Sequence, residues 1–254
     1  MDSCVDMVYV LKLDKNNEKE MRNHLEEVGI KRFQFYSVPG CVSDKNEGDM
    51  KLSLLDIMSH NPTNAIAQDI TQNHVAMIKK AYMEGYTRVL FLEEDARLEK
   101  EAFEIKKWQP VSEWIQNCPK WDIFYLGYCN WPLVMSFLIT TRIVKVWDPL
   151  LAHAYILNKR GMEKILNFTE NGVKNMEMHI DKMYTRIPNF QKYACLPMVA
   201  FQNKDPALHT KACDHLNIRV SIKSLCWWNQ YISVAIPILI LLFIAWLTTR
   251  MFFF

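Results

Sequence analysis

Apolar and polar residues alternate along the first part of the chain in strand-like and helix-like patterns. The β-branched and apolar run from Val8 to Leu13 is typical of a buried strand. Apolar residues then recur at helical spacing over residues 21–28, and Gly29 is a common helix stop. Residues 32–38 alternate as a second strand. The chain is therefore predicted to open with a strand–helix–strand unit.

A second unit follows a polar stretch from Cys41 to Asp69, which we expect to form loops and short helices. Helical spacing returns from Asn73 to Glu84. The apolar run RVLFL from Arg88 to Leu92 is a strand that ends abruptly in three acids, residues 93–95. Strands that alternate with helices predict an α/β domain with a mostly parallel sheet flanked by helices.

The C-terminal part contains a long apolar run. Nineteen residues without a charge, Tyr231 to Thr249, span roughly 28 Å as a helix, close to the ~30 Å of a hydrocarbon core. Trp227 and Trp228 lie just before this run and Trp246 lies near its far end, where tryptophan prefers the headgroup level. A buried core helix is the alternative, but such a helix would carry a polar stripe. We expect a domain over residues 1–210, a linker over 211–228 and a membrane helix over 229–250.

The charges beside this run predict its orientation. Lys211, Arg219 and Lys223 precede it and Arg250 follows it, a bias that places the domain on the cytoplasmic side. The first residues show no signal peptide, since they carry acids where one needs positive charge. We therefore expect a tail-anchored protein with a cytosolic domain.

Composition excludes some classes of function. Thirty Lys and Arg against twenty-eight Asp and Glu give a net charge of +2, which does not favour nucleic-acid binding. Seven cysteines without a C-x-x-C pair argue against a disulfide framework and against a zinc site.

The acidic end of the second predicted strand is the first chemical clue. Open α/β sheets bind ligands at the carboxyl ends of their strands, where Glu93, Glu94 and Asp95 would stand. Three adjacent carboxylates repel one another unless they are solvated or hold a divalent cation. The alternative is a solvated loop whose acids cap a helix that starts near Glu99.

Seven segments carry motifs in one order, and together they resemble glycosyltransferase family 25, the group of lipopolysaccharide glycosyltransferases and procollagen galactosyltransferases. The segments are Val8 to Ile30, with Asp14 on the motif's Asp; Asn73-His74-Val75; Glu84 to Ala96; the W-D-x-x-x-L-G of Trp121 to Gly127; His153 to Leu157, with Gly161 and Met162; His179-Ile180-Asp181; and Tyr193 to Gln202. They cover nearly all of the part before the apolar run.

The resemblance implies a GT-A type domain that transfers a hexose from a nucleotide-sugar, with inversion and typically with Mn²⁺. It assigns Glu93 and Asp95 to the metal, and Glu94 to the ribose or the metal. Asp181 is the candidate base, because an inverting displacement needs a proton acceptor near the acceptor hydroxyl. Its alternative role is a favourable charge at a helix N-terminus.

Other matched positions have weaker assignments. His74 could face the donor or cap local backbone groups. His153 and Tyr155 alternate along a strand, so both face one side, as in a sugar or diphosphate site, although Tyr155 could equally be core. Asp14 ends the first strand, where base and ribose often rest.

Departures from the pattern leave a second hypothesis open. Glu94 replaces the middle Asp of the family's E-D-D, and Asn73 replaces the Ser of its S-H-L. The chain is then either an active transferase, acting on a glycan, lipid-linked or protein acceptor, or a silent relative that serves as a membrane-anchored binding module. Transfer on the cytosolic face would favour an unusual cell-surface or viral route, such as that of a large DNA virus.

Overall fold

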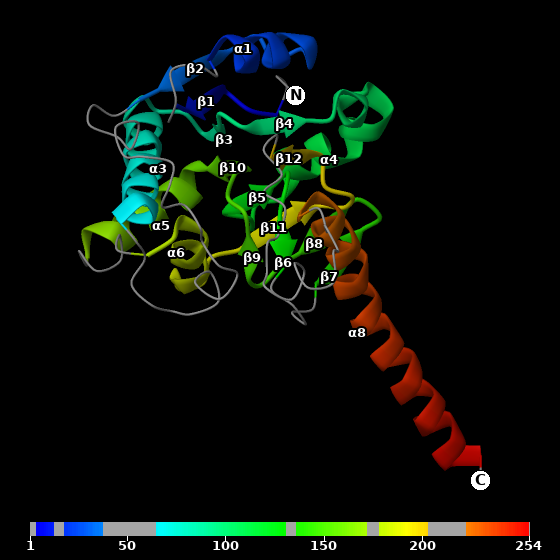
Figure 1. The fold of residues 1–254 in the computed structure, drawn as a ribbon. Helices are drawn as coiled ribbons and strands as arrows, with labels where there is room; N and C mark the ends of the chain where they lie inside the picture. Colours follow the sequence, from blue (N-terminus) through cyan, green and yellow to red (C-terminus); the bar gives the residue numbers. More distant parts are fainter. Residues whose placement is uncertain are drawn as a thin grey trace, which may run out of the picture.

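One mixed sheet of eight strands forms the centre of the protein in the computed structural model, which describes residues 4–12, 18–37, 65–130, 136–171, 178–202 and 222–253. Their order across the sheet is β2-β1-β3-β10-β5-β11-β8-β7 (Figure 1). The strands are β1 (Met7–Leu11), β2 (Phe33–Tyr36), β3 (Arg88–Glu93), β5 (Ile123–Tyr125), β7 (Phe137–Thr140), β8 (Ile143–Lys145), β10 (Ala154–Asn158) and β11 (Lys192–Cys195).

Six of the eight strands point in one direction, as the prediction of a mostly parallel sheet requires. β1 runs parallel to both β2 and β3, and β5 runs parallel to β11. β10 lies antiparallel between β3 and β5, and β8 is reversed between β11 and β7. The start of β10 therefore lies at the same edge of the sheet as the end of β3.

Two small sheets complete this edge. β4 (Ala96–Leu98) pairs antiparallel with β12 (Ala200–Gln202). β6 (Cys129–Asn130) pairs antiparallel with β9 (Pro149–Leu150). The first of these pairs sets Gln202 opposite Ala96, one residue beyond the three acids.

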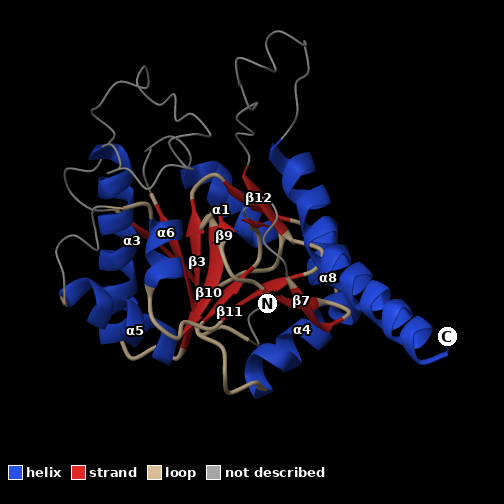
Figure 2. Cartoon of the chain, turned by 90° about the horizontal axis from the view of Figure 1, so that it is seen from below, coloured by secondary structure: helices blue, strands red, loops and turns tan. Residues whose placement is uncertain are grey.

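Helices cover both faces of the central sheet because successive strand residues point to opposite sides. Val89 and Phe91 share a core with α3 (Ala65–Met83), α5 (Lys159–Glu170) and α6 (Ile180–Arg186), which lie together on one side in Figure 2. Leu90 and Leu92 pack with α1 (Glu18–Glu27) and α4 (Ile105–Asn117). The predicted α/β class with flanking helices, the architecture expected of a GT-A type domain, is confirmed.

Two local expectations are wrong. Helix α3 begins at Ala65 rather than at Asn73, so it includes the end of the stretch that was expected to form loops and short helices, because apolar residues already recur at helical spacing there. The acids do not cap a helix near Glu99: strand β4 follows them, and Glu99 precedes a short 3₁₀ turn, η2 (Lys100–Phe103), without a side-chain cap. Residues 96–98 form a strand because they pair with β12, which is distant in the sequence.

Helix α8 (Ile222–Phe253) runs along the domain and then leaves it (Figure 1). It starts within the segment predicted as linker, of which residues 211–221 lie outside the described part. Its stretch Cys226–Thr248 is long and apolar enough to cross a membrane. The side chains of Ile238 to Thr248 are exposed on all sides of the helix. A C-terminal apolar helix is therefore present, as predicted.

The first half of α8 is docked on the domain through one buried stripe: Cys226, Gln230, Ser233, Val234 and Pro237. Gln230 Oε1 accepts the backbone N–H of Met198 at 3.0 Å, and the carbonyl of Ser233 accepts that of Ser136 at 3.0 Å. Asn130 donates through Nδ2 to the hydroxyls of Ser136 and Ser233. The docked half of the helix thus has a short polar stripe, Gln230 and Ser233, on the side that faces the domain.

Candidate functional site at the carboxyl edge of the sheet

The three acids stand where β3 ends and the antiparallel β10 begins. Glu93 is the last residue of β3, and Glu94 and Asp95 form the turn into β4. The backbone N–H of Glu93 donates to the carbonyl of His153 at 2.9 Å. His153 lies in the turn just before β10 rather than inside the strand. The fold therefore brings two separate motifs to one point.

A chain of buried polar side chains supports Glu93. His74, on α3, places Nε2 3.3 Å from Glu93 Oε1 and Nδ1 2.8 Å from the hydroxyl of Tyr155. Tyr184, on α6, donates to the same Tyr155 hydroxyl at 2.8 Å. On the other side, Gln202 Nε2 donates to Glu93 Oε2 at 3.3 Å. Both oxygens of Glu93 are thus held, which fixes the direction of the carboxylate.

His74 and Tyr155 are fully buried, and their polar side-chain atoms form hydrogen bonds with other protein side chains. His74 does not cap backbone groups; it bridges α3 to Glu93 and Tyr155. Tyr155 is a core residue through its ring, as one of the two expectations had it, while its hydroxyl belongs to the chain of polar side chains that reaches Glu93. Contact of either residue with a donor stays a prediction, and the structure shows them orienting Glu93.

Asp181 lies in the first turn of α6 and holds the loop that precedes β10. Its two carboxylate oxygens accept the backbone N–H groups of Leu151 at 2.9 Å and Ala152 at 2.8 Å. Leu151 has φ of 72°, a left-handed conformation that costs about 1 kcal/mol or more and that this contact holds in place. Burial raises the pKa of Asp181 to about 6, the charge of Glu93 adds to the rise, and the two N–H groups oppose it.

The acidic turn places three carboxylates next to one another in a partly buried position. Burial, together with the neighbouring charges of Glu93 and Glu94, raises the pKa of Asp95 to about 7. A divalent cation would relieve both causes, and carboxylate oxygens are ligands suited to Mg²⁺ or Mn²⁺. Within the described ranges no group of three or more His, Cys, Asp or Glu side chains is placed to hold a metal. A cation bound at this turn would have to take its other ligands from a substrate or from water.

His153 packs directly over Gly127, at the carboxyl end of β5. A Cβ at Gly127 would lie 2.3 Å from the carbonyl oxygen of Ala200 and 2.4 Å from Nε2 of His153. Only glycine fits this approach, which explains the last position of the W-D-x-x-x-L-G motif. Burial lowers the pKa of His153 below its ordinary value, so the imidazole is neutral near pH 7.

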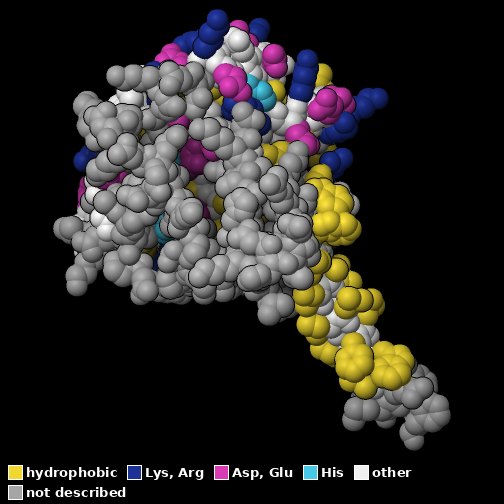
Figure 3. All heavy atoms as spheres, in the orientation of Figure 1, with side chains coloured by type: hydrophobic (Ala, Val, Ile, Leu, Met, Phe, Trp, Pro, Cys, Tyr) yellow, Lys and Arg dark blue, Asp and Glu magenta, His cyan; other side chains and the backbone are white. Residues whose placement is uncertain are grey.

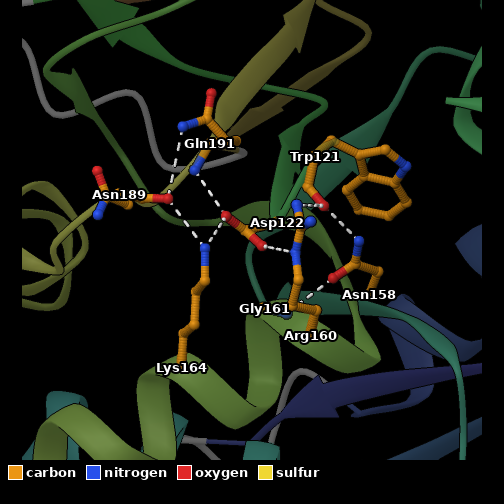
Figure 4. Close-up of polar contacts among 8 residues, drawn as sticks. All are labelled: Trp121, Asp122, Asn158, Arg160, Gly161, Lys164, Asn189 and Gln191. Atoms are coloured by element: carbon orange, nitrogen blue, oxygen red, sulfur yellow. Dashed lines mark hydrogen bonds and ion pairs between the residues drawn. The ribbon is translucent and has the colours of Figure 1, made fainter. Parts of the chain in front are cut away.

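The W-D part of that motif lies at the opposite, amino edge of the sheet (Figure 4). The fully buried carboxylate of Asp122 accepts from Arg160 Nε at 2.6 Å, Lys164 Nζ at 2.8 Å and the backbone N–H of Gln191 at 2.7 Å. The carbonyl of Trp121 accepts from Arg160 as well. This motif position joins β5, α5 and the start of β11, and it serves the fold rather than the acidic edge.

Sequence reasoning missed two members of the site and left one unplaced. Gln202 closes a matched motif, but no role was assigned to it before its bond to Glu93 was seen. Tyr184 gave no signal in the sequence, since it reads as an ordinary apolar position of a helix. Asp14, the predicted contact to base and ribose, lies outside the described residues.

Comparison with known proteins gave fold-level likenesses. No family model matches the chain, and no curated protein matches it. A crystal structure of a glycosyltransferase involved in glycosylation of the major capsid of PBCV-1 aligns with TM-score 0.41 and 12% identity, covering 74% of this chain and 80% of that one. A197 from STIV aligns over the same shares with TM-score 0.39 and 12% identity. An apo UDP-glucose pyrophosphorylase gives 0.36 and 10%, over 74% and 72%.

Proposed function

We propose that this chain is a membrane-anchored relative of glycosyltransferase family 25 that transfers a hexose from a nucleotide-sugar, with a UDP-hexose as the expected donor. One observation carries the proposal. Residues that the resemblance assigns to chemistry come from four separate motifs, and Glu93, His74, His153 and Asp181 meet at the carboxyl edge of the sheet. Ligands of open α/β sheets bind at this edge.

The acidic turn would hold the metal. Glu93 and Asp95 would bind a divalent cation such as Mn²⁺, with Glu94 beside it toward the ribose or the metal, and the bound ion would neutralise charge on the diphosphate leaving group. The protein's own contribution is orientation: His74 and Gln202 fix the two oxygens of Glu93. A carboxylate held in this way needs no reorganisation when the charge of the leaving group develops.

Asp181 is the proposed base. In an inverting displacement the acceptor oxygen bonds to the anomeric carbon, the bond to the diphosphate breaks, and the acceptor's proton passes to the base. A carboxyl with a pKa of about 6 is ionised at pH 7 and still basic enough to take that proton. Its N–H bonds to Leu151 and Ala152 occupy one position on each oxygen, and a carboxylate oxygen can accept more than one hydrogen bond.

Helix α8 is proposed as a tail anchor that keeps the domain on the cytosolic side, where nucleotide-sugars are available. The positive residues before the uncharged apolar run support this orientation. Acceptors would then be glycans, lipid-linked sugars or proteins at the membrane surface. The competing function is a silent, membrane-anchored binding module of the same fold.

Donor turnover by the full chain, reconstituted in liposomes, tests the proposal. We expect UDP release from UDP-glucose or UDP-galactose that requires Mn²⁺, and a loss of at least about 100-fold in Asp95→Asn and Asp181→Asn. Glu101→Gln is the matched control, because it removes one exposed carboxylate on η2 and should leave the rate unchanged. Calorimetry that detects no UDP-hexose binding in the folded wild type would instead favour the silent module.

A further inference from the structure

An exposed apolar patch lies on the edge of the sheet next to α8. It consists of Phe137, Leu138 and Ile139 of the outer strand β7, together with Trp147, whose ring meets that of Phe137 at 6.3 Å. These four side chains are between 44% and 51% exposed. Other large apolar side chains exposed on the domain, such as Met83 and Ile105, are single residues on separate helices. The patch therefore requires an explanation that scattered surface residues do not.

The length of α8 determines where along the helix a hydrocarbon layer would have to begin. Within the uncharged run from Tyr231, the residues up to Pro237 include three that are buried on the domain. The freely exposed part, Ile238 to Thr248, spans only about 16 Å of helix, well short of the ~30 Å of a hydrocarbon core. A span of about 20 residues that ends at Thr249 begins at Gln230, so if α8 crosses a bilayer, the apolar layer must begin beside the docked residues Gln230 and Ser233.

Strand β7 begins beside Ser233 of α8, at the level where the apolar layer would begin. Ser136, the residue before β7, donates its backbone N–H to the carbonyl of Ser233, so the patch and the beginning of the apolar layer are adjacent. Figure 3 shows the apolar side chains of α8 continuing beyond the domain. The patch thus lies beside the place where the apolar part of the helix leaves the domain.

The chemistry of the patch suits the boundary between headgroups and acyl chains. Tryptophan and phenylalanine prefer that depth. Lys145 places its ammonium 5.3 Å from the ring centre of Trp147, and Arg142 is the neighbouring cation on the turn from β7 to β8. Such cations can meet lipid phosphates while their stems stay on apolar surface. An outer strand also has backbone groups that need water, which the headgroup layer supplies.

We propose that β7 and Trp147 insert into the membrane interface and form a second membrane contact beside α8. This inference rests on the proposed anchoring by α8. It commits to lipid as the occupant, and it means that the domain touches the bilayer with a defined edge of its sheet.

Site-specific photocrosslinking in the full chain tests the inference. The photoreactive residue p-benzoylphenylalanine replaces Phe137, Ile139 or Trp147, one at a time, in protein reconstituted into liposomes of phosphatidylcholine and phosphatidylserine. Leu242, on the exposed part of α8, is the positive control. Met83 is the negative control, because it is exposed and apolar but lies on α3, on the side of the domain opposite α8 (Figures 1 and 2). Thermal unfolding of each variant verifies its fold.

We expect adducts with acyl chains at all three patch positions and at Leu242, and none at Met83. Adducts at Leu242 alone would overturn the contact by β7 while leaving the anchor intact. The absence of lipid adducts at every position, Leu242 included, would refute the anchor and the inference that rests on it. Adducts between two copies of the chain at the patch would also overturn the inference, because a second protein edge would then cover β7.

Discussion

Replacing Asp122 by Asn should destabilise the domain strongly without touching the acidic edge. The carboxylate of Asp122 is fully buried and accepts three bonds, two of them from the cations of Arg160 and Lys164. Removing one member of a buried ion pair costs about 3 to 5 kcal/mol. The two cationic side chains are 43% and 29% exposed, so they can regain water, which places the expected cost near 3 kcal/mol.

Thermal and urea unfolding of the full chain in detergent would measure this cost. A loss of 3 kcal/mol corresponds to a drop in Tm of about 6 to 12 °C for a domain of this size. Glu104→Gln is the control, since it removes an exposed partner of Lys107 and should cost at most about 1 kcal/mol. If Asp122→Asn lowered the free energy of unfolding by less than about 1 kcal/mol, the structural role assigned to the W-D motif would be refuted.

Three further predictions concern the carboxyl edge. Gly127→Ala should cost about 3 kcal/mol or more in urea unfolding, because its Cβ would meet the Ala200 carbonyl and the His153 ring; a cost below about 1 kcal/mol would contradict the close approach. Tyr155→Phe should cost about 1 to 3 kcal/mol, since it leaves the buried groups of His74 and Tyr184 short of a partner. The turnover rate should fall below pH about 6, where Asp181 is protonated and cannot take a proton; a flat pH–rate profile from pH 5 to 8 would exclude it as the base.

Asp181 also links stability to pH, with a definite sign. Its folded pKa lies above its ordinary value of 3.8, so its contribution to the free energy of unfolding is fully present below pH about 4 and is lost as the pH rises through about 6. Urea titrations between pH 4 and 7 should show this decline in the wild type. The difference between wild type and Asp181→Asn should vary with pH in that window and become constant above it.

Local pattern was enough to predict the first elements of the core, from β1 to β3. The run from Val89 to Leu92 is buried on both faces and consists of apolar residues alone, so a buried strand could be predicted there directly. Strand β4 could not be read in this way. It has three residues, and its pairing with β12 joins positions a hundred residues apart.

The contacts within the site were hidden from sequence for a similar reason. His74, Glu93 and Tyr155 meet because α3, β3 and β10 are neighbours in space, and no local periodicity encodes that they are. The order of motifs identified each residue separately, and the fold supplied their distances. Tyr184 had neither signal, because it completes the chain of hydroxyls from a helix position that resembles ordinary core.

Asn130, Gln230 and Ser233 hold the first half of α8 against the domain, so the exposed second half continues directly from a docked helix and not from a flexible linker. A tethered head samples acceptors over the whole reach of its linker. If α8 anchors the chain, a domain docked on this helix would stay at one height above the bilayer and would move only in the plane of the membrane. The distance between the acidic edge and the lipid would then determine which acceptors can react, because only hydroxyl groups at that height would reach the site.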